Sequence, residues 1–129
     1  MKVEAGHIYI APGGYHMTVK GPVTEPTLLI NSDPPENFCR PAVDPMFRSL
    51  ATVFGASTLA LVLTGMGADG AKGGDVIAKS GGSVIAQDEA TSVVWGMPGA
   101  AATIGCCSEL LPLADIGQRV TEIVRGDVR

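Results

Sequence analysis

The chain has 129 residues, of which 46% are hydrophobic and 17% are charged, and its formal net charge is −4. This length and composition suit one globular domain with its own core, so we expect a single domain over residues 1–129. The acidic balance and the lack of any Lys or Arg cluster longer than two residues exclude a basic footprint for nucleic acid or for an anionic membrane surface.

The N-terminal part of the sequence predicts short strands. Residues 7–11 and 15–20 are expected to pair as an antiparallel hairpin around the turn at 12–14, which contains two glycines. A further short strand is expected over residues 28–30.

Next comes a predicted helix over residues 41–54. Pro34 and Pro35 enforce an extended stretch before it. Within the helix, apolar residues recur at helical spacing, which indicates a stripe facing the core: Val43, Phe47, Leu50 and Phe54.

The middle of the chain has the pattern of a βαβ unit. Short apolar strands over residues 59–64 and 83–86 flank a helix that begins at Asp69 or Gly70 and runs to residue 79. Such apolar runs are typical of parallel strands covered on both faces. Two helices, over residues 97–104 and 113–124, complete an α/β fold with a mostly parallel, doubly wound sheet and an N-terminal antiparallel hairpin.

The turn after the first strand of this unit is the most informative segment. Residues 65–70 match G-x-G-x-x-G, which predicts dinucleotide binding where it joins a strand to a helix. However, Asp69 lies inside the loop whose amide N–H groups would bind a pyrophosphate, and its charge would repel that ligand. Asp69 lies beyond the C-terminal end of a buried strand, where open α/β sheets place their chemistry, so it is the candidate functional residue.

Several ordered motifs carry a resemblance to a known family. They are Tyr9-Ile10-Ala11-Pro12-Gly13-Gly14, the segment from Arg40 to Asp44, Leu63-Thr64-Gly65-Met66-Gly67-Ala68-Asp69-Gly70, the segment from Ile85 to Ala90, and the segment from Ser92 to Pro98. Together they resemble the C-terminal catalytic domain of the chemotaxis methylesterase CheB. The resemblance covers roughly residues 6–116.

The resemblance implies an activity and a role for two residues. Enzymes of this family hydrolyse methyl esters of glutamate side chains on chemoreceptors, and deamidate certain glutamines, through a serine, a histidine and an aspartate. Asp69 matches the aspartate, which orients the histidine, and Met66 matches a methionine that helps to shape the oxyanion side of the pocket. The family implies a methylated chemoreceptor as partner, a cytoplasmic location, and neither a cofactor nor a metal.

Two residues imitate the rest of a triad. The family carries its serine and histidine in segments upstream of anything that aligns here, and its receiver domain lies further upstream. Ser57 precedes a strand instead of following one, so we expect it at the opposite end of the sheet from a nucleophile elbow. His16 is expected to be a turn or strand residue, and His7 is the only other histidine. The sequence therefore predicts a sheet that is incomplete at its N-terminal side and a triad of which only Asp69 is present.

Other readings stay open beside the enzyme. The chain could be an inactive binding or scaffold fragment in which Asp69 only caps a helix. An incomplete sheet would expose a strand edge, so self-association is expected.

Cys39, Cys106 and Cys107 are expected to be small buried apolar residues. Residues 49–68 carry no charge, but their glycines and hydroxyls divide them into helix, turn and strand, so no membrane insertion is expected.

Overall fold

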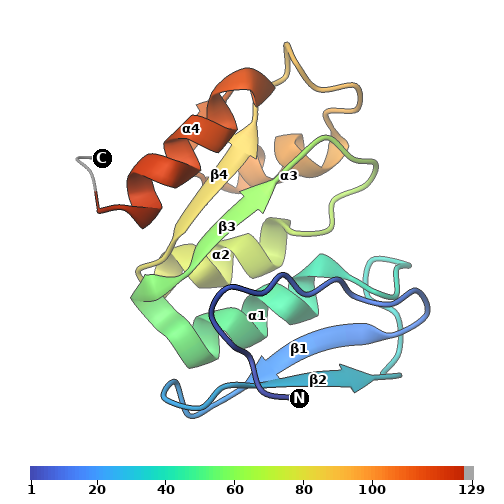
Figure 1. The fold of residues 1–129 in the computed structure, drawn as a ribbon. Helices are drawn as coiled ribbons and strands as arrows, with labels where there is room; N and C mark the ends of the chain where they lie inside the picture. The colour runs from blue at the N-terminus through green and yellow to red at the C-terminus, as the bar shows by residue number, and fades with distance from the viewer. Residues whose placement is uncertain (127–129) are drawn as a thin grey trace.

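The computed structural model describes residues 1–126 and has an α/β architecture (Figure 1). In chain order the elements are β1 (His16–Lys20), β2 (Thr27–Asn31), α1 (Val43–Phe54), the short 3-10 helix η1 (Gly55–Ser57), β3 (Leu59–Val62), α2 (Ala71–Lys79), β4 (Ser83–Gln87), α3 (Gly96–Ile104), β5 (Glu109–Leu111) and α4 (Leu113–Val124). The predicted helices are confirmed, with ends that differ by at most two residues.

The elements are stacked in layers (Figure 1). The β1–β2 hairpin packs on α1, α1 packs on α2, and α2 lies between α1 and the parallel sheet. α4 lies on the opposite side of the sheet from α2 (Figure 1). α1 therefore lies directly against α2, the helix that follows the glycine turn at residues 65–70.

The parallel sheet has the strand order β3-β4-β5. β3 and β4 are in register from the pair Leu59 and Ser83 to the pair Val62 and Ala86, which confirms the predicted βαβ unit. β5 extends the sheet on the far side of β4. The sequence did not indicate this strand, because three residues are too few to show the alternation typical of a strand.

The hairpin forms with a different partner from the one expected. β1 pairs with β2 from His16 opposite Asn31 to Lys20 opposite Thr27, whereas residues 7–11 belong to no strand. Ile8 is 92% exposed and Ile10 is 86% exposed, so the alternation of apolar residues in that segment has no core to face. The prediction of a strand at 7–11 is therefore wrong, and the short strand predicted at 28–30 is the true partner.

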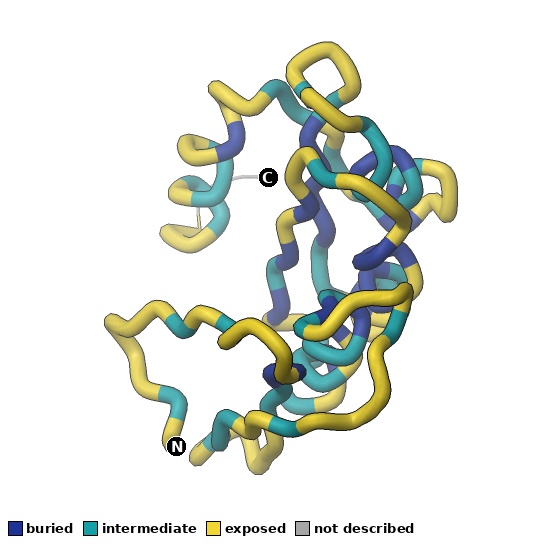
Figure 2. Tube along the Cα trace, turned by 90° about the vertical axis from the view of Figure 1, so that its right-hand side faces the viewer, coloured by how far each residue is buried: buried dark blue, intermediate teal, exposed yellow. Residues whose placement is uncertain are grey.

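The core lies between the parallel sheet and the helices α1, α2 and α3. Its members are apolar residues from all of these elements, among them Phe47, Val62, Ile77, Val84 and Ala101. Figure 2 shows the buried residues gathered along the sheet and the helices packed on it, with the segment before β1 mostly exposed.

The two central strands are covered differently. β4 is buried on both faces, as expected for a parallel strand. β3 buries Ala60 and Val62 against the core, while Leu61 is 37% exposed and Leu63, just beyond the strand, is 43% exposed. The expectation that both strands are covered on both faces is therefore wrong for β3.

Candidate active site

Asp69 lies in the turn that connects β3 to α2, beyond the C-terminal end of the strand. The turn depends on glycine, because Gly67 and Gly70 have φ values of +94° and +98°, in the left-handed region that other residues rarely adopt. The turn carries the Asp69 side chain inward, where it is only 6% exposed.

The Asp69 carboxylate accepts three hydrogen bonds from described residues. The backbone N–H of Val43 donates to Oδ2 at 2.6 Å, and that of Asp44 donates to Oδ1 at 3.0 Å. The Asn37 side-chain amide also donates to Oδ1, at 2.9 Å. Asp69 therefore caps the N-terminus of α1, a helix far away in the sequence, and its charge lies at the positive end of that helix dipole.

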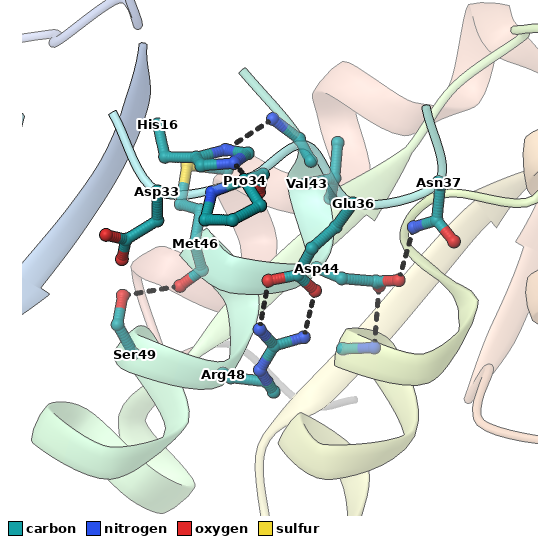
Figure 3. A network of polar contacts seen from close by, with 12 residues as sticks. His16, Asp33, Pro34, Glu36, Asn37, Val43, Asp44, Met46, Arg48 and Ser49 are labelled. Atoms are coloured by element: carbon teal, nitrogen blue, oxygen red, sulfur yellow. Dashed lines mark hydrogen bonds and ion pairs between the residues drawn. The ribbon is translucent and has the colours of Figure 1, made fainter. Parts of the chain in front are cut away.

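Asp44 makes the reciprocal contact. It is 1% exposed, and its Oδ1 accepts the backbone N–H groups of Gly70 at 3.0 Å and Gly73 at 2.8 Å, at the N-terminus of α2. Its Oδ2 accepts the Asn37 amide at 2.8 Å (Figure 3). α1 thus supplies the carboxylate that caps α2, and the turn before α2 supplies the carboxylate that caps α1.

Buried carboxylates need compensation, and here it comes from dipoles. Among the described residues, neither Asp44 nor Asp69 forms an ion pair. The nearby Arg48 pairs instead with Glu36 through two hydrogen bonds, at 2.8 and 2.6 Å (Figure 3). This contact lowers the pKa of Glu36 and raises the pKa of Arg48. The two aspartates are therefore stabilised by amide N–H groups and helix N-termini.

The turn packs closely against the start of α3. A Cβ on Gly96, at the start of α3, would lie 2.9 Å from the Gly65 carbonyl oxygen and 2.9 Å from the Gly67 nitrogen. The Asp44 carboxylate occupies the N-terminus of α2, where a pyrophosphate would have to bind. The contacts of the G-x-G-x-x-G segment therefore argue against dinucleotide binding.

Met66 lies in the same turn and is 83% exposed. The turn beneath it is anchored to the segment before α3, because Gly65 N–H donates to the Val94 carbonyl at 3.2 Å and Met97 N–H donates to the Gly65 carbonyl at 2.9 Å. A fixed turn thus presents Met66 and Asp69, the first to the outside and the second to the interior.

His16 and Ser57 do not join Asp69. His16 is a residue of β1, as predicted; its Nδ1 accepts the Ala42 N–H at 3.2 Å, and its Nε2 contacts the Pro34 carbonyl at 3.0 Å (Figure 3). Both ring nitrogens are therefore engaged by backbone groups. Ser57 lies in η1 before β3, whereas Asp69 follows β3, so the serine is at the opposite end of the strand, as predicted.

The three cysteines differ in how far they are exposed to solvent. Cys106 is buried, but Cys39 is exposed and Cys107 is half-buried, so the expectation that all three are buried is wrong. Burial raises the pKa of Cys106 and raises the pKa of Cys107 to about 12. Neither of these two thiols is activated as a nucleophile. Among residues 1–126, no three His, Cys, Asp or Glu side chains are grouped as a metal site requires.

Sequence reasoning missed Asn37 and the role of Asp44. An acidic residue in the first turn of a predicted helix is a capping signal, and it could have pointed to Asp44. The Asn37 contacts join segments whose proximity only the fold establishes.

The fold and the site define an α/β domain with a buried carboxylate beyond the C-terminal end of a parallel strand. Comparison with known families gives the same assignment more specifically, because the model of the CheB methylesterase family matches residues 1–120. The chain belongs to the CheB methylesterase family.

Relatives of known name and structure agree. A protein of Rhodospirillum rubrum named protein-glutamate methylesterase/protein-glutamine glutaminase 1 is 66% identical over 118 residues, which are 92% of this chain and 30% of that protein. A protein of the same name in Paramagnetospirillum magneticum is 59% identical over 94% of this chain and 32% of its own length. The chain thus spans about a third of these curated relatives.

A solved structure shows the same fold. The crystal structure of the Thermotoga maritima CheB methylesterase catalytic domain superposes with a TM-score of 0.91 at 36% identity, over 95% of this chain and 65% of that one. The predicted α/β fold is therefore confirmed.

Proposed function

We propose that this chain is the C-terminal portion of a protein-glutamate methylesterase catalytic domain and that Asp69 is the acid of its Ser-His-Asp triad. The observation that carries the proposal is the Asp69 carboxylate itself, which is buried at the C-terminal end of β3 and held by three donors. A serine and a histidine from a segment that precedes these residues in the family complete the site.

The hydrogen bonds of Asp69 support the proposed contact with a histidine. A carboxylate has about four acceptor positions, two on each oxygen. Among the described residues, Oδ1 of Asp69 receives two donors and Oδ2 receives one. An imidazole N–H is the proposed fourth donor.

This arrangement supports ester hydrolysis in two stages. The serine oxygen attacks the ester carbonyl while the histidine takes its proton, and Asp69 stabilises the imidazolium that forms. The proton then passes to the leaving methoxide, which departs as methanol and leaves an acyl-enzyme. Water releases the glutamate carboxylate by the same route, and a glutamine substrate releases ammonia in place of methanol.

The proposed substrate is a methylated glutamate on the cytoplasmic part of a chemoreceptor, which places the protein in the cytoplasm. Two observations support this assignment: the family of the chain, and the names of its relatives. No helix among residues 1–126 is long and apolar enough to cross a membrane. Met66, exposed on the turn that carries Asp69, is proposed to line the oxyanion side of the pocket.

A second function is favoured by the same contacts. Asp69 caps α1, so it could serve a fragment that binds or scaffolds without catalysis. In that case its replacement would change stability alone.

The test uses a chimera that joins this chain to the part of the Rhodospirillum rubrum relative preceding the matched region. Methanol release from methylated chemoreceptor is measured for the chimera and for Asp69→Asn. We expect the rate to fall by about 10⁴, because asparagine carries no charge to stabilise the imidazolium. Asparagine keeps one acceptor oxygen, so it retains part of the capping of α1.

The matched control is Asp115→Asn, an exposed aspartate in the first turn of α4. It should leave the rate unchanged, and thermal unfolding should show both variants folded. A folded Asp69→Asn chimera with the parental rate would refute the triad assignment and favour the scaffold.

A further inference from the structure

Asn37 joins the two buried carboxylates of the site. Its amide nitrogen donates to Asp44 Oδ2 at 2.8 Å and to Asp69 Oδ1 at 2.9 Å. The residue lies in the loop before α1 with a φ of +53°, a left-handed conformation in which asparagine is enriched. Asn37 is thus the one side chain among the described residues that bonds to Asp69.

The two Asp69 oxygens accept different numbers of hydrogen bonds from the described residues. Oδ1 accepts the Asp44 N–H and the Asn37 amide, which fills its two acceptor positions. Oδ2 accepts the Val43 N–H alone among the described donors. A further donor is therefore directed to Oδ2.

We propose that Asn37 is a positioning residue of the esterase: by filling Oδ1 it directs the triad imidazole to Oδ2 of Asp69. The inference rests on the proposed triad role of Asp69. Without Asn37, both oxygens have an open position, and the imidazole can take two orientations, of which one faces the serine. Because the proposed role of Asn37 is exerted through Asp69, the proposal predicts a loss in kcat with an unchanged KM.

The experiment uses the same chimera and two variants of Asn37. Asn37→Gly keeps the left-handed backbone and removes the amide. Asn37→Asp keeps the size but sets a third carboxylate beside two others. We expect kcat to fall about 10-fold in the glycine variant, the usual effect of losing a hydrogen bond to a charged group, and further in the aspartate variant.

Phe38→Gly is the matched control. Phe38 is the next residue of the loop, has a φ of +63°, and is fully exposed. It shares the backbone conformation of Asn37 without the contacts to the carboxylates, so its replacement should leave kcat unchanged. An equal loss in both glycine variants would assign the effect to the loop and overturn the proposal.

A double-mutant cycle separates positioning from stability. If Asn37 acts through Asp69, Asn37→Gly should have no further effect on kcat once Asp69 is asparagine. A full 10-fold effect in that background, or wild-type kcat in both Asn37 variants, would overturn the positioning role. Either result leaves the triad assignment standing if Asp69→Asn alone lowers kcat by about 10⁴. An unchanged kcat in Asp69→Asn would refute the proposed function itself.

Discussion

At the scale of single residues, Asp44 and Asp69 form reciprocal helix caps. Each is buried, and each takes its hydrogen bonds from the N-terminus of the helix that belongs to the other. The sequence indicated Asp69 because it follows a strand and lies in a recognisable turn. It did not indicate the cross-capping, because a cap read from sequence is looked for on the adjacent helix, and Asp69 caps α1 instead of α2.

Asp44→Ala should therefore destabilise the fold. The change leaves the N–H groups of Gly70 and Gly73 and the Asn37 amide without their acceptor, and we expect a loss of about 3 kcal/mol in the free energy of unfolding. Urea unfolding measures it, with Asp115→Ala on exposed α4 as the control. An unchanged midpoint for Asp44→Ala would show that these bonds do not hold the two helices.

The thiols should label in a fixed order. Cys39 is exposed, whereas burial raises the pKa of Cys107 to about 12 and also raises that of Cys106. Because the thiolate is the form that reacts, iodoacetamide at pH 8 should alkylate Cys39 first and the other two only after unfolding. Mass spectrometry of the native protein would contradict this if Cys106 or Cys107 were modified at the rate of Cys39.

At the scale of elements, the close contact of α1 with α2 positions the site. A Cβ on Gly73 would lie 2.7 Å from the Phe47 Cβ and 3.0 Å from the Asp44 Cα, so the two helices meet where only glycine fits. The helices themselves were predictable from apolar spacing. Their contact was not, because a glycine inside a helical pattern does not say which element approaches it.

Gly73→Ala should cost about 1–3 kcal/mol of stability through overpacking. The matched control is Gly117→Ala, in α4, where an added Cβ meets nothing within 4 Å. This control should stabilise the protein by about 0.5–1 kcal/mol, the ordinary helix preference for alanine over glycine. Equal effects of the two substitutions on the thermal midpoint would contradict the close approach.

Strand pairing was the least predictable feature of the elements. Residues 7–11 alternate in polarity, but Ile8 and Ile10 have no core beneath them, so the alternation did not produce a strand. β2 pairs with β1 instead, and the three-residue strand β5 forms an edge of the parallel sheet. Pairing is decided by long-range packing, which local pattern does not contain.

At the scale of the whole molecule, β3 is an edge of the described sheet and has an exposed apolar face. It pairs with β4 on one side, and Leu61 and Leu63 are 37% and 43% exposed. We propose that the 129-residue chain self-associates through this edge, as unpaired apolar edges do.

Light scattering after size exclusion should show an apparent mass that rises with concentration. Leu61→Lys with Leu63→Lys should return the chain to a monomer, whereas Leu113→Lys, at a 54% exposed position of α4, should not. A monomer at every concentration would contradict the edge proposal.

We propose that Asp69 works with a serine and a histidine from the segment that precedes these residues in the family. Methanol release from methylated chemoreceptor tests this proposal when the chain alone, the chimera and the Ser57→Ala variant of each are assayed side by side. We expect no release by the chain alone, and release by the chimera that Ser57→Ala leaves unchanged. Release by the chain alone that Ser57→Ala abolishes would contradict it, because the nucleophile would then be the serine before β3.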